Sequence, residues 1–389
     1  MVYSQNRADG WDWPKADTDA PFSGKNVGII RMNPTCLFRQ YRNLFSVLLA
    51  LFYVPAGEQV FAQSGSDPGF LQRLHPSDVR VMSWNVRLGS VIPPEGARHQ
   101  SFARIVRAMD PDVIVLQEIM RPEESEKLKP LMDSINPLSD GRSWQIHGVA
   151  DNVLLSRFPL RQPDGELVFR YPYPKLGLPD FHYGYATALV DIPDDYSNAN
   201  LYVIAMHNKS GAGEEHVELR QQQSDSIVRW MRNLRDSSRE TTIDKNTPVV
   251  ILGDMNVVRD ASTQPFETLL VGDIVDEAAF GSDFVMDWDG TALTDARPSH
   301  NGKGEDFYTW RYDEMPFEPG ALDRVIYTDS VLLVHQSFVL NTTIMSVDEL
   351  TGLNLQESDV LYGGLPGFYD HLPLIVDFSF TSAPDAGGR

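Results

Sequence analysis

VVILGDMN, residues 249–256, has four apolar residues that run into a glycine and then into a carboxylate and a carboxamide. The apolar run after Pro248 predicts a buried strand, and Gly253 permits a backbone turn at its end. Spaced two residues apart, Asp254 and Asn256 are expected to point to the same side and to present acceptor and donor groups to one spot. Taken alone, the segment fits a strand closed by an Asx turn equally well.

Five other apolar runs border polar residues in the same way. These runs are VRVMSWN at 79–85, DVIVLQE at 112–118, LYVIAM at 201–206, ALDRVIY at 321–327 and LIVDF at 374–378. The polar residues at their borders are Asn85, Glu118, His207, Asp323 and the pair Asp370 and His371. A single Asp or His at a strand end is usually structural. Six such borders in one chain, with Asp254 and Asn256 included, are better explained by a shared site.

Helices are predicted between the strands. At 98–109, apolar residues recur at helical spacing and Pro111 ends the pattern, and residues 122–134 and 214–235 are further helices. The Tyr-, Pro- and Gly-rich run at 171–185 and the Asp- and Gly-rich run at 280–305 are predicted to be loops. The sequence therefore predicts alternating α and β elements with many buried strands.

Composition indicates a globular protein with an acidic surface. The chain has 389 residues, 42% of them hydrophobic, and a formal net charge of -21. This charge argues against a broad electrostatic footprint for nucleic acid, although a local basic groove remains compatible with it. The one cysteine, Cys36, precedes the predicted domain, so a disulfide framework, a zinc–thiolate site and a cysteine nucleophile are excluded there.

The first sixty residues contain the pattern of a secretory signal peptide. Arg39 and Arg42 precede the apolar run LFSVLLALFYV at 44–54, which is too short to span a bilayer, and small residues follow near Ala62. A buried helix or an uncleaved anchor is the alternative. We expect a non-native extension at 1–31, a signal peptide at 32–62, a linker at 63–78, a domain at 79–380 and a tail at 381–389. The mature chain is then periplasmic or secreted, monomeric and without a transmembrane segment.

The polar residues at the strand ends are rich in oxygen, with two histidines and no thiol. Glu118, Asn85 and Asp370 are ligands of the kind that Mg²⁺ or Ca²⁺ prefers. Histidines beside such a site are suited to acid–base catalysis on phosphate esters. The set therefore points to metal-assisted phosphoester chemistry.

At this point the chain resembles a known family. The segments SWNVRLG, DVIVLQE, NVLLSRFPL, AMHNKSG, ILGDMNV, ALDRVIY and YDHLPL occur in the order found in the endonuclease/exonuclease/phosphatase superfamily, and the likeness covers about residues 79–378. The resemblance implies an α/β fold of four layers, in which two mixed β-sheets pack face to face and helices flank them, as in deoxyribonuclease. The site would lie at one edge, where the strand ends converge.

The resemblance also implies roles for individual residues. Glu118 would be the principal metal ligand, with Asn85 as ligand or phosphate contact and Asp370 assisting. His371 would be the general base, Asp323 would orient it, and His207 would neutralise developing charge or serve the leaving group. Asp254 and Asn256 would position the nucleophile and the phosphate, and Asp151 stands where a carboxylate would pair with His207. The expected phosphate-facing residues are Lys209, Arg220, Arg324 and Asn152, and for the three cations the alternative is a solvated surface position or a salt bridge.

These expectations define a leading function and two alternatives. The leading one is an exported phosphodiesterase that uses Mg²⁺, with Mn²⁺ or Ca²⁺ possible, most simply a nuclease. A phospholipid or sphingomyelin phosphodiesterase or a phosphomonoesterase is the second. A catalytically inactive binding module on the same scaffold is the third, and the presence of both histidines and all the expected ligands argues against it.

Overall fold

The computed structural model describes residues 69–381, except 94–95, 120–121, 140, 163–166, 174–177, 239–241 and 259–260. These residues belong to one compact unit, Ser66–Arg389. The expected extension and signal peptide, and the tail from 382 onward, lie outside the described residues.

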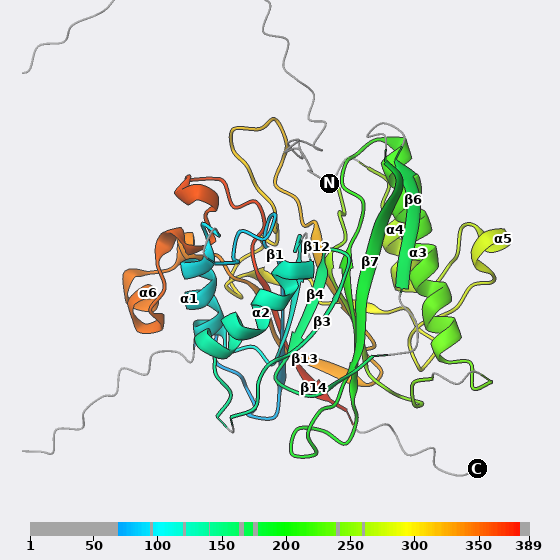
Figure 1. Ribbon diagram of the computed structural model, residues 1–389, viewed down its shortest axis with the longest axis horizontal. Helices are drawn as coiled ribbons and strands as arrows, with labels where there is room; N and C mark the ends of the chain where they lie inside the picture. Colours follow the sequence, from blue (N-terminus) through cyan, green and yellow to red (C-terminus); the bar gives the residue numbers. More distant parts are fainter. Residues whose placement is uncertain are drawn as a thin grey trace, which may run out of the picture. The chain divides into compact units, whose positions relative to one another are not determined.

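Two mixed β-sheets form the centre of this unit (Figure 1). The first has the strand order β11-β13-β14-β1-β2-β4-β3, and the second has the order β10-β12-β9-β8-β7-β5, with β6 paired to β7. The strands of the first sheet are β1 (Val79–Asn85), β2 (Val113–Gln117), β3 (Gln145–Val149), β4 (Asn152–Ser156), β11 (Ser299–His300), β13 (Leu332–Val339) and β14 (Leu374–Phe380). Those of the second are β5 (Leu160–Arg161), β6 (Leu167–Tyr173), β7 (Leu178–Val190), β8 (Leu201–His207), β9 (Val249–Asp254), β10 (Thr294–Asp295) and β12 (Asp323–Tyr327).

Helices cover the outer faces of both sheets and complete the four layers. The α-helices are α1 (His99–Met109), α2 (Pro122–Ile135), α3 (Glu214–Leu234), α4 (Gln264–Val271), α5 (Glu277–Phe280) and α6 (Val347–Leu353), and three 3-10 helices are η2 (Thr342–Ile344), η3 (Glu357–Val360) and η4 (Tyr362–Gly364). Figure 1 shows α1 and α2 on one side of the sheets and α3 and α4 on the other. The fold of two mixed β-sheets flanked by helices, which the family resemblance implies, is confirmed.

The continuous apolar run of β9 follows from its position between two cores. Val250 and Leu252 join the core between the sheets, whereas Val249 and Ile251 join the core beneath α3 and α4. A strand covered on both faces needs apolar residues at every position rather than at every second one. All four side chains are fully buried, and each contributes roughly 1.5–3 kcal/mol relative to exposure.

Strand pairing brings the predicted polar residues to one edge. β1 runs parallel to β2, which sets Asn85 opposite Gln117, one residue before Glu118. β8 runs parallel to β9, which sets His207 opposite Asp254, and the antiparallel strand β12 sets Asp323 opposite the same Asp254. The two sheets thus direct their polar strand ends to a common place.

Some local predictions were wrong. The run at 171–185 is not a loop: its described residues lie in β6 and β7, which pair antiparallel. Alternating aromatic residues favour strands, and this preference outweighed the Pro and Gly signals. Strand β13 and helix α6 were not predicted. The run at 280–305 is largely irregular as expected, but it contains β10 and β11.

The segment expected as a linker is anchored from residue 69 onward. The ring of Phe70 packs edge-on against Phe338 at 5.0 Å between centroids. Arg73 Nη1 donates to Asp112 Oδ2 at 2.6 Å and to the Asp78 carbonyl at 2.9 Å. The described part of the segment is therefore held against the first sheet rather than being a loose arm.

Candidate active site

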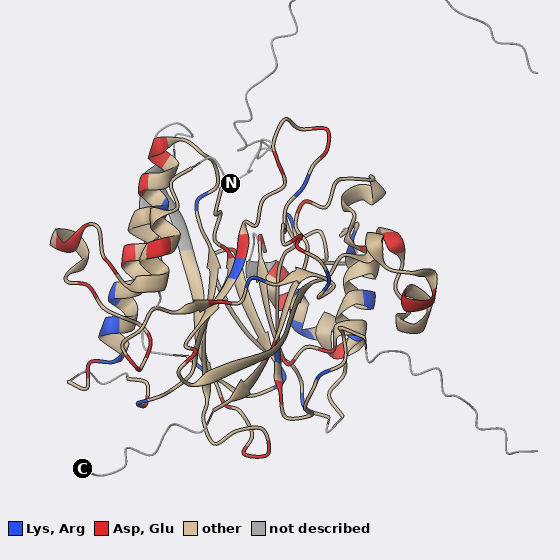
Figure 2. Cartoon of the chain, turned by 180° about the vertical axis from the view of Figure 1, so that it is seen from behind, with Lys and Arg blue, Asp and Glu red and all other residues tan. Residues whose placement is uncertain are grey.

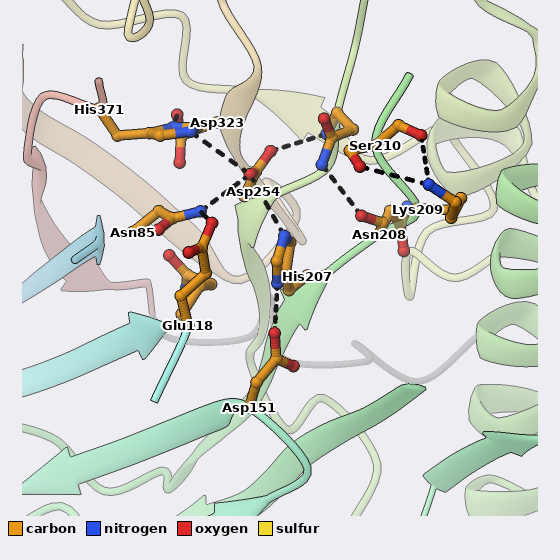
Figure 3. A network of polar contacts seen from close by, with 12 residues as sticks. Asn85, Glu118, Asp151, His207, Asn208, Lys209, Ser210, Asp254, Asp323 and His371 are labelled. Carbon is orange, nitrogen blue, oxygen red and sulfur yellow. Dashed lines mark hydrogen bonds and ion pairs between the residues drawn. The ribbon is translucent and has the colours of Figure 1, made fainter. Parts of the chain in front are cut away.

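Asp254 lies at the centre of the site, at the end of β9 (Figure 3). Its Oδ2 atom is 3.6 Å from His207 Nε2, 3.6 Å from His371 Nε2 and 3.1 Å from Asn85 Nδ2. Two histidines from different sheets thus point their Nε2 atoms at one carboxylate oxygen. Burial raises the pKa of Asp254, against the opposing effect of His371.

Gly253 allows strands β8 and β9 to approach each other closely, and it does not form the turn predicted from the sequence. It lies inside β9 with φ of 138°, a conformation that side chains disfavour. A Cβ atom on this residue would lie 2.0 Å from the Met206 carbonyl oxygen of β8. The glycine therefore allows β8 and β9 to bring His207 and Asp254 together.

Each histidine is held by a second carboxylate through Nδ1. His371 Nδ1 bonds Asp323 Oδ2 at 2.7 Å, and His207 Nδ1 bonds Asp151 Oδ2 at 2.5 Å. The second contact confirms the pairing expected from the resemblance. A carboxylate on Nδ1 fixes the ring and leaves Nε2 facing Asp254.

Nearby carboxylates raise the pKa of both imidazoles and so favour their protonated forms in the metal-free protein. Burial by itself lowers the pKa of His371, but Asp323 and Asp254 raise it to about 10. Burial likewise opposes the charge on His207, while Asp151 and Asp254 raise its pKa to about 9. The acidic surroundings outweigh desolvation in both cases.

Glu118 follows β2 and is held by amide groups. Its Oε1 accepts from Asn85 Nδ2 at 3.1 Å and its Oε2 from the Leu88 backbone N–H at 3.0 Å. The donor turn has left-handed backbone at Arg87 and Leu88, with φ of 45° and 51°. Burial raises the pKa of Glu118, and nearby Asp370 raises it further.

Asp370 and His371 precede β14 in a tight turn. Asp370 has left-handed backbone with φ of 58°, and its Oδ1 accepts from Arg87 Nη1 at 2.7 Å. Arg87 is not predicted as a site residue from the sequence. Its position two residues after Asn85 is the feature that could have indicated it. The side chain of Arg87 also lies 4.6 Å from the centroid of the Tyr362 ring.

Asn256 differs from its prediction. It lies two residues beyond the strand with φ of 50°, so the period of two no longer applies. Its backbone N–H donates to Asp254 Oδ1 at 3.0 Å, and its Nδ2 donates to the Asn208 carbonyl at 2.9 Å. The side chain thus fixes the loop after β8, and the backbone makes the Asx-type contact considered as the alternative.

The loop after β8 carries Lys209 beside the site. Lys209 Nζ donates to the Ser210 carbonyl at 2.8 Å, and the Lys209 backbone N–H donates to Gln223 of α3 at 2.9 Å. Arg220 Nη1 donates to the carbonyls of Lys209 and Gly211 at 2.7 and 2.6 Å. Arg220 is buried and holds this loop, so its observed contacts are structural.

The remaining two predicted phosphate contacts lie elsewhere. Arg324 forms an ion pair with Asp295 and lies over the Phe266 ring, 4.6 Å from its centroid. As the neighbour of Asp323 in a strand, it faces the opposite side of the sheet. Asn152 Nδ2 donates to Asp151 Oδ1 at 3.2 Å and to the Gly184 carbonyl at 2.7 Å. Asn152 therefore orients the carboxylate that holds His207.

The donor set fits a hard divalent cation. Four carboxylates of the site are buried: Glu118, Asp254, Asp323 and Asp370. Asp254 and Asp323 face histidines and Asp370 is paired with Arg87, whereas Glu118 forms no ion pair with a described residue. A buried carboxylate that lacks a cation is costly, and oxygen donors suit Mg²⁺, Mn²⁺ or Ca²⁺.

A second group of side chains lies close enough together to bind a metal ion. Asp254, Asp323 and His371 each place one ligand atom within 4.8 Å of the others. In this set, however, Asp323 is already bonded to His371 Nδ1. We therefore favour Glu118 and Asn85 as the metal ligands. Among the described residues, Glu118 Oε2 accepts a hydrogen bond only from the Leu88 backbone N–H.

Comparison with protein families identifies the class. Residues 82–346 match the model of the Endonuclease/Exonuclease/phosphatase family, which is more than half of the chain. The chain belongs to this family, whose members are generally phosphoester hydrolases. A search of curated proteins found no match.

Several solved structures are similar to this chain. The human Nocturnin catalytic domain with bound sulfate is 16% identical, with a TM-score of 0.47, and the match covers 78% of this chain and 95% of that one. An endonuclease/exonuclease/phosphatase from Beutenbergia cavernae is 20% identical, with a TM-score of 0.48, and the match covers 79% and 73%. Truncated TDP2 from Caenorhabditis elegans is 15% identical, with a TM-score of 0.45, and the match covers 78% and 98%.

Proposed function

We propose that the chain is a divalent-metal-dependent phosphodiester hydrolase that acts on nucleic acid and is exported. The observation that carries this proposal is the convergence of His207 and His371 on Asp254, with Glu118 and Asn85 beside them. Two oriented histidines across one carboxylate suit proton transfer to both sides of a phosphate.

Glu118 and Asn85, with Asp370 assisting, would hold the metal ion. When bound there, a divalent cation would polarise a phosphate oxygen and offset the negative charge that keeps His371 protonated. Mg²⁺ is the proposed ion, with Mn²⁺ or Ca²⁺ as alternatives. Arg87 would have to share Asp370 with the ion, since the two compete for the same carboxylate.

The two histidines would have different tasks. His371, oriented by Asp323, would act as the base in its neutral form: the Nε2 proton first passes to solvent, and Nε2 then accepts a proton from the attacking water. His207, whose pKa is raised by Asp151 and Asp254, would be the acid: it would give its proton to the leaving oxygen or stabilise the charge on the phosphate. Asp254 aligns both Nε2 atoms, and Lys209 would contribute further positive charge beside the phosphate.

A nucleic-acid strand is the proposed substrate because cationic and aromatic groups adjoin the catalytic turn. Arg87 lies over the rings of Tyr362 and Phe368, and Phe368 stacks on Tyr312 at 4.0 Å between centroids. Phe368 is buried, so the partly exposed rings of Tyr312 and Tyr362 and the guanidinium of Arg87 would be the groups that meet a single strand, whose bases stack and whose phosphates are anionic. Elsewhere acidic residues are spread over the helices and loops (Figure 2), so the contact would be local.

A substrate panel tests the proposal. Plasmid DNA, a single-stranded oligonucleotide, a chromogenic phosphodiester and sphingomyelin vesicles are each incubated with the mature chain and Mg²⁺. We expect cleavage of the nucleic acids and of the chromogenic ester, and a loss of about 100-fold or more in His371→Ala. The control is His335→Ala, in β13, whose ring bonds Asp78. Cleavage of the vesicles alone would support the lipid alternative, and no hydrolysis of any ester would contradict the proposal.

Export is a separate part of the proposal and rests on the sequence pattern at 32–62. None of the helices described by the structure has the length and hydropathy to traverse a bilayer. We expect the mature chain to begin near Gln63 and to be monomeric. N-terminal sequencing of the exported protein checks the first point, and a chain that retains residue 32 after export would contradict cleavage.

A further inference from the structure

Trp84 lies directly behind the catalytic turn. This β1 side chain is fully buried, and its Nε1–H donates to the carbonyl oxygen of His371 at 3.0 Å. The turn is also tied at Leu372, whose N–H donates to the Thr309 carbonyl at 2.7 Å. Because Asp370 has left-handed backbone, the turn depends on such contacts to keep its conformation. The indole is therefore one of the groups that set the direction of the His371 ring.

Arg98 places an unusual charge against the same indole. Its guanidinium carbon lies 4.7 Å from the centroid of Trp84 and 5.8 Å from that of Tyr362. The side chain is buried, and among the described residues its Nε and Nη1 atoms have no hydrogen-bond partner, while Nη2 is 3.4 Å from the Val360 carbonyl. A buried cation without a carboxylate is costly, so core packing alone is a poor reason for an arginine here.

The charge is retained at neutral pH. Burial lowers the pKa of Arg98 to about 10, and attraction to Asp370 opposes this effect. The guanidinium is thus a fixed positive charge between two aromatic rings and close to the catalytic turn. Cation–π contact with tryptophan is strongest where water is excluded.

Helix α1 delivers this charge and supports the indole at a second point. Phe102, one helical turn after Arg98, stacks on Trp84 at 6.1 Å between centroids and an interplanar angle of 24°. Side chains four residues apart lie on the same face of a helix, so α1 presents both groups to one indole. The contacts form a continuous path from α1 through Trp84 to the His371 backbone.

We propose that Arg98 and Trp84 are positioning residues for His371: the charge of Arg98 fixes the indole, and the indole N–H fixes the carbonyl from which the imidazole projects toward Asp254. The kinetic consequence rests on the proposed role of His371 as general base. The structural consequence, the orientation of the ring against Asp323, does not depend on any activity.

Three variants separate charge, hydrogen bond and packing. Arg98→Met keeps a long side chain and removes the charge, Arg98→Lys keeps the charge, and Trp84→Phe keeps an aromatic face and removes the N–H donor. Arg104→Met is the matched control on α1, because Arg104 pairs with Asp359, with Nε 3.0 Å from Oδ2, and has no stacking contact with Trp84.

The first readout is the NMR signal of the His371 Nδ1 proton, assigned in metal-free protein by its loss in His371→Gln. We expect Arg98→Met and Trp84→Phe to move or broaden this signal, and Arg98→Lys and Arg104→Met to leave it in place. The second readout is hydrolysis of the chromogenic phosphodiester. We expect kcat to fall about 10-fold in Arg98→Met and Trp84→Phe, with KM within about twofold, because a small misplacement of a base affects the chemical step.

An unchanged signal and unchanged kcat in a folded Arg98→Met would overturn the proposal and leave Arg98 as core packing. A fall in Arg98→Lys equal to that in Arg98→Met would also overturn it, because the charge would then be irrelevant. If Arg98→Met does not fold, Trp84→Phe decides: an unmoved proton signal rejects the path to His371. If the wild type hydrolyses no ester, the proposed function fails, while the proton signal still decides the positioning role.

Discussion

At the scale of single residues, Asp254 has a more central place than its sequence position indicates. The sequence predicts that the side chains of Asp254 and Asn256 face one spot, whereas in the structure the two residues are in contact but their side chains bind different partners. Asp254 receives two histidines and Asn85, whereas the Asn256 side chain binds the loop after β8. The alternation of side chains along a strand predicts the direction of Asp254, which ends β9. It does not predict the direction of Asn256, whose backbone is left-handed and lies beyond the strand.

The His207–Asp151 pair predicts a pH-dependent stability in the metal-free protein. The pKa of His207 is raised from 6.5 to about 9, so the folded state binds the proton more tightly than the unfolded state. This contribution is fully present below about pH 6.5 and is lost as the pH rises toward 9. We expect Asp151→Asn to lower the free energy of unfolding at pH 6 by on the order of 2 kcal/mol, and by much less at pH 9.5.

Urea unfolding of both proteins in EDTA at several pH values measures this difference. A gap between wild type and Asp151→Asn that stays constant from pH 6 to 9.5 would show that the pair does not hold the proton of His207.

At the scale of elements, the site depends on how closely β8 and β9 approach each other. Gly253→Ala places a Cβ atom 2.0 Å from the Met206 carbonyl and forces a side chain into φ of 138°. We expect the free energy of unfolding to fall by about 3 kcal/mol and the His207–Asp254 geometry to be disturbed.

Gly352→Ala is the control for this change. It lies in α6, and a Cβ atom there meets nothing within 4 Å, so the variant should be neutral or slightly stabilising. Denaturant titration measures both variants. Equal stability of Gly253→Ala and wild type would contradict the close-approach explanation.

Some strands and contacts can be predicted from the sequence and others cannot. The runs of β2, β8 and β9 are predictable because they are apolar nearly throughout, as buried strands are, whereas β1 is predictable from the alternation at its start. The β6–β7 pair was taken for a loop because its Pro and Gly residues conceal an alternating aromatic pattern. Arg324 was expected at the phosphate because its charge is visible in the sequence, whereas its pairing with Asp295 depends on tertiary structure. Trp84 and Arg98 were missed for the same reason.

At the scale of the whole molecule, the two sheets form one site only because each contributes strand ends to the same edge. Glu118, Asn85 and His371 come from the first sheet or the turn before its last strand, and His207, Asp254 and Asp323 come from the second. The core between the sheets holds these two sets in register.

The anchored segment before β1 supports this packing. A chain that starts at residue 79 loses the Phe70–Phe338 contact and leaves buried Asp112 without Arg73. We expect it to unfold at lower urea than a chain that starts at residue 66, with a loss of about 3 kcal/mol from lost apolar burial and from a buried carboxylate that keeps only the more distant Arg157, at 3.6 Å. Equal midpoints for the two chains would show that this segment adds nothing to stability.

The central claim is that Glu118 recruits a divalent cation to a site in which His371 is the base. The most direct measurement is the rate of hydrolysis of a chromogenic phosphodiester as Mg²⁺ is titrated into metal-free wild type, Glu118→Gln and His371→Gln. The account predicts saturable activity in the wild type, a shift to much higher Mg²⁺ in Glu118→Gln, and a rate at least about 100-fold lower at saturating Mg²⁺ in His371→Gln. Wild-type activity without metal, or titration curves that coincide for wild type and Glu118→Gln, would contradict it.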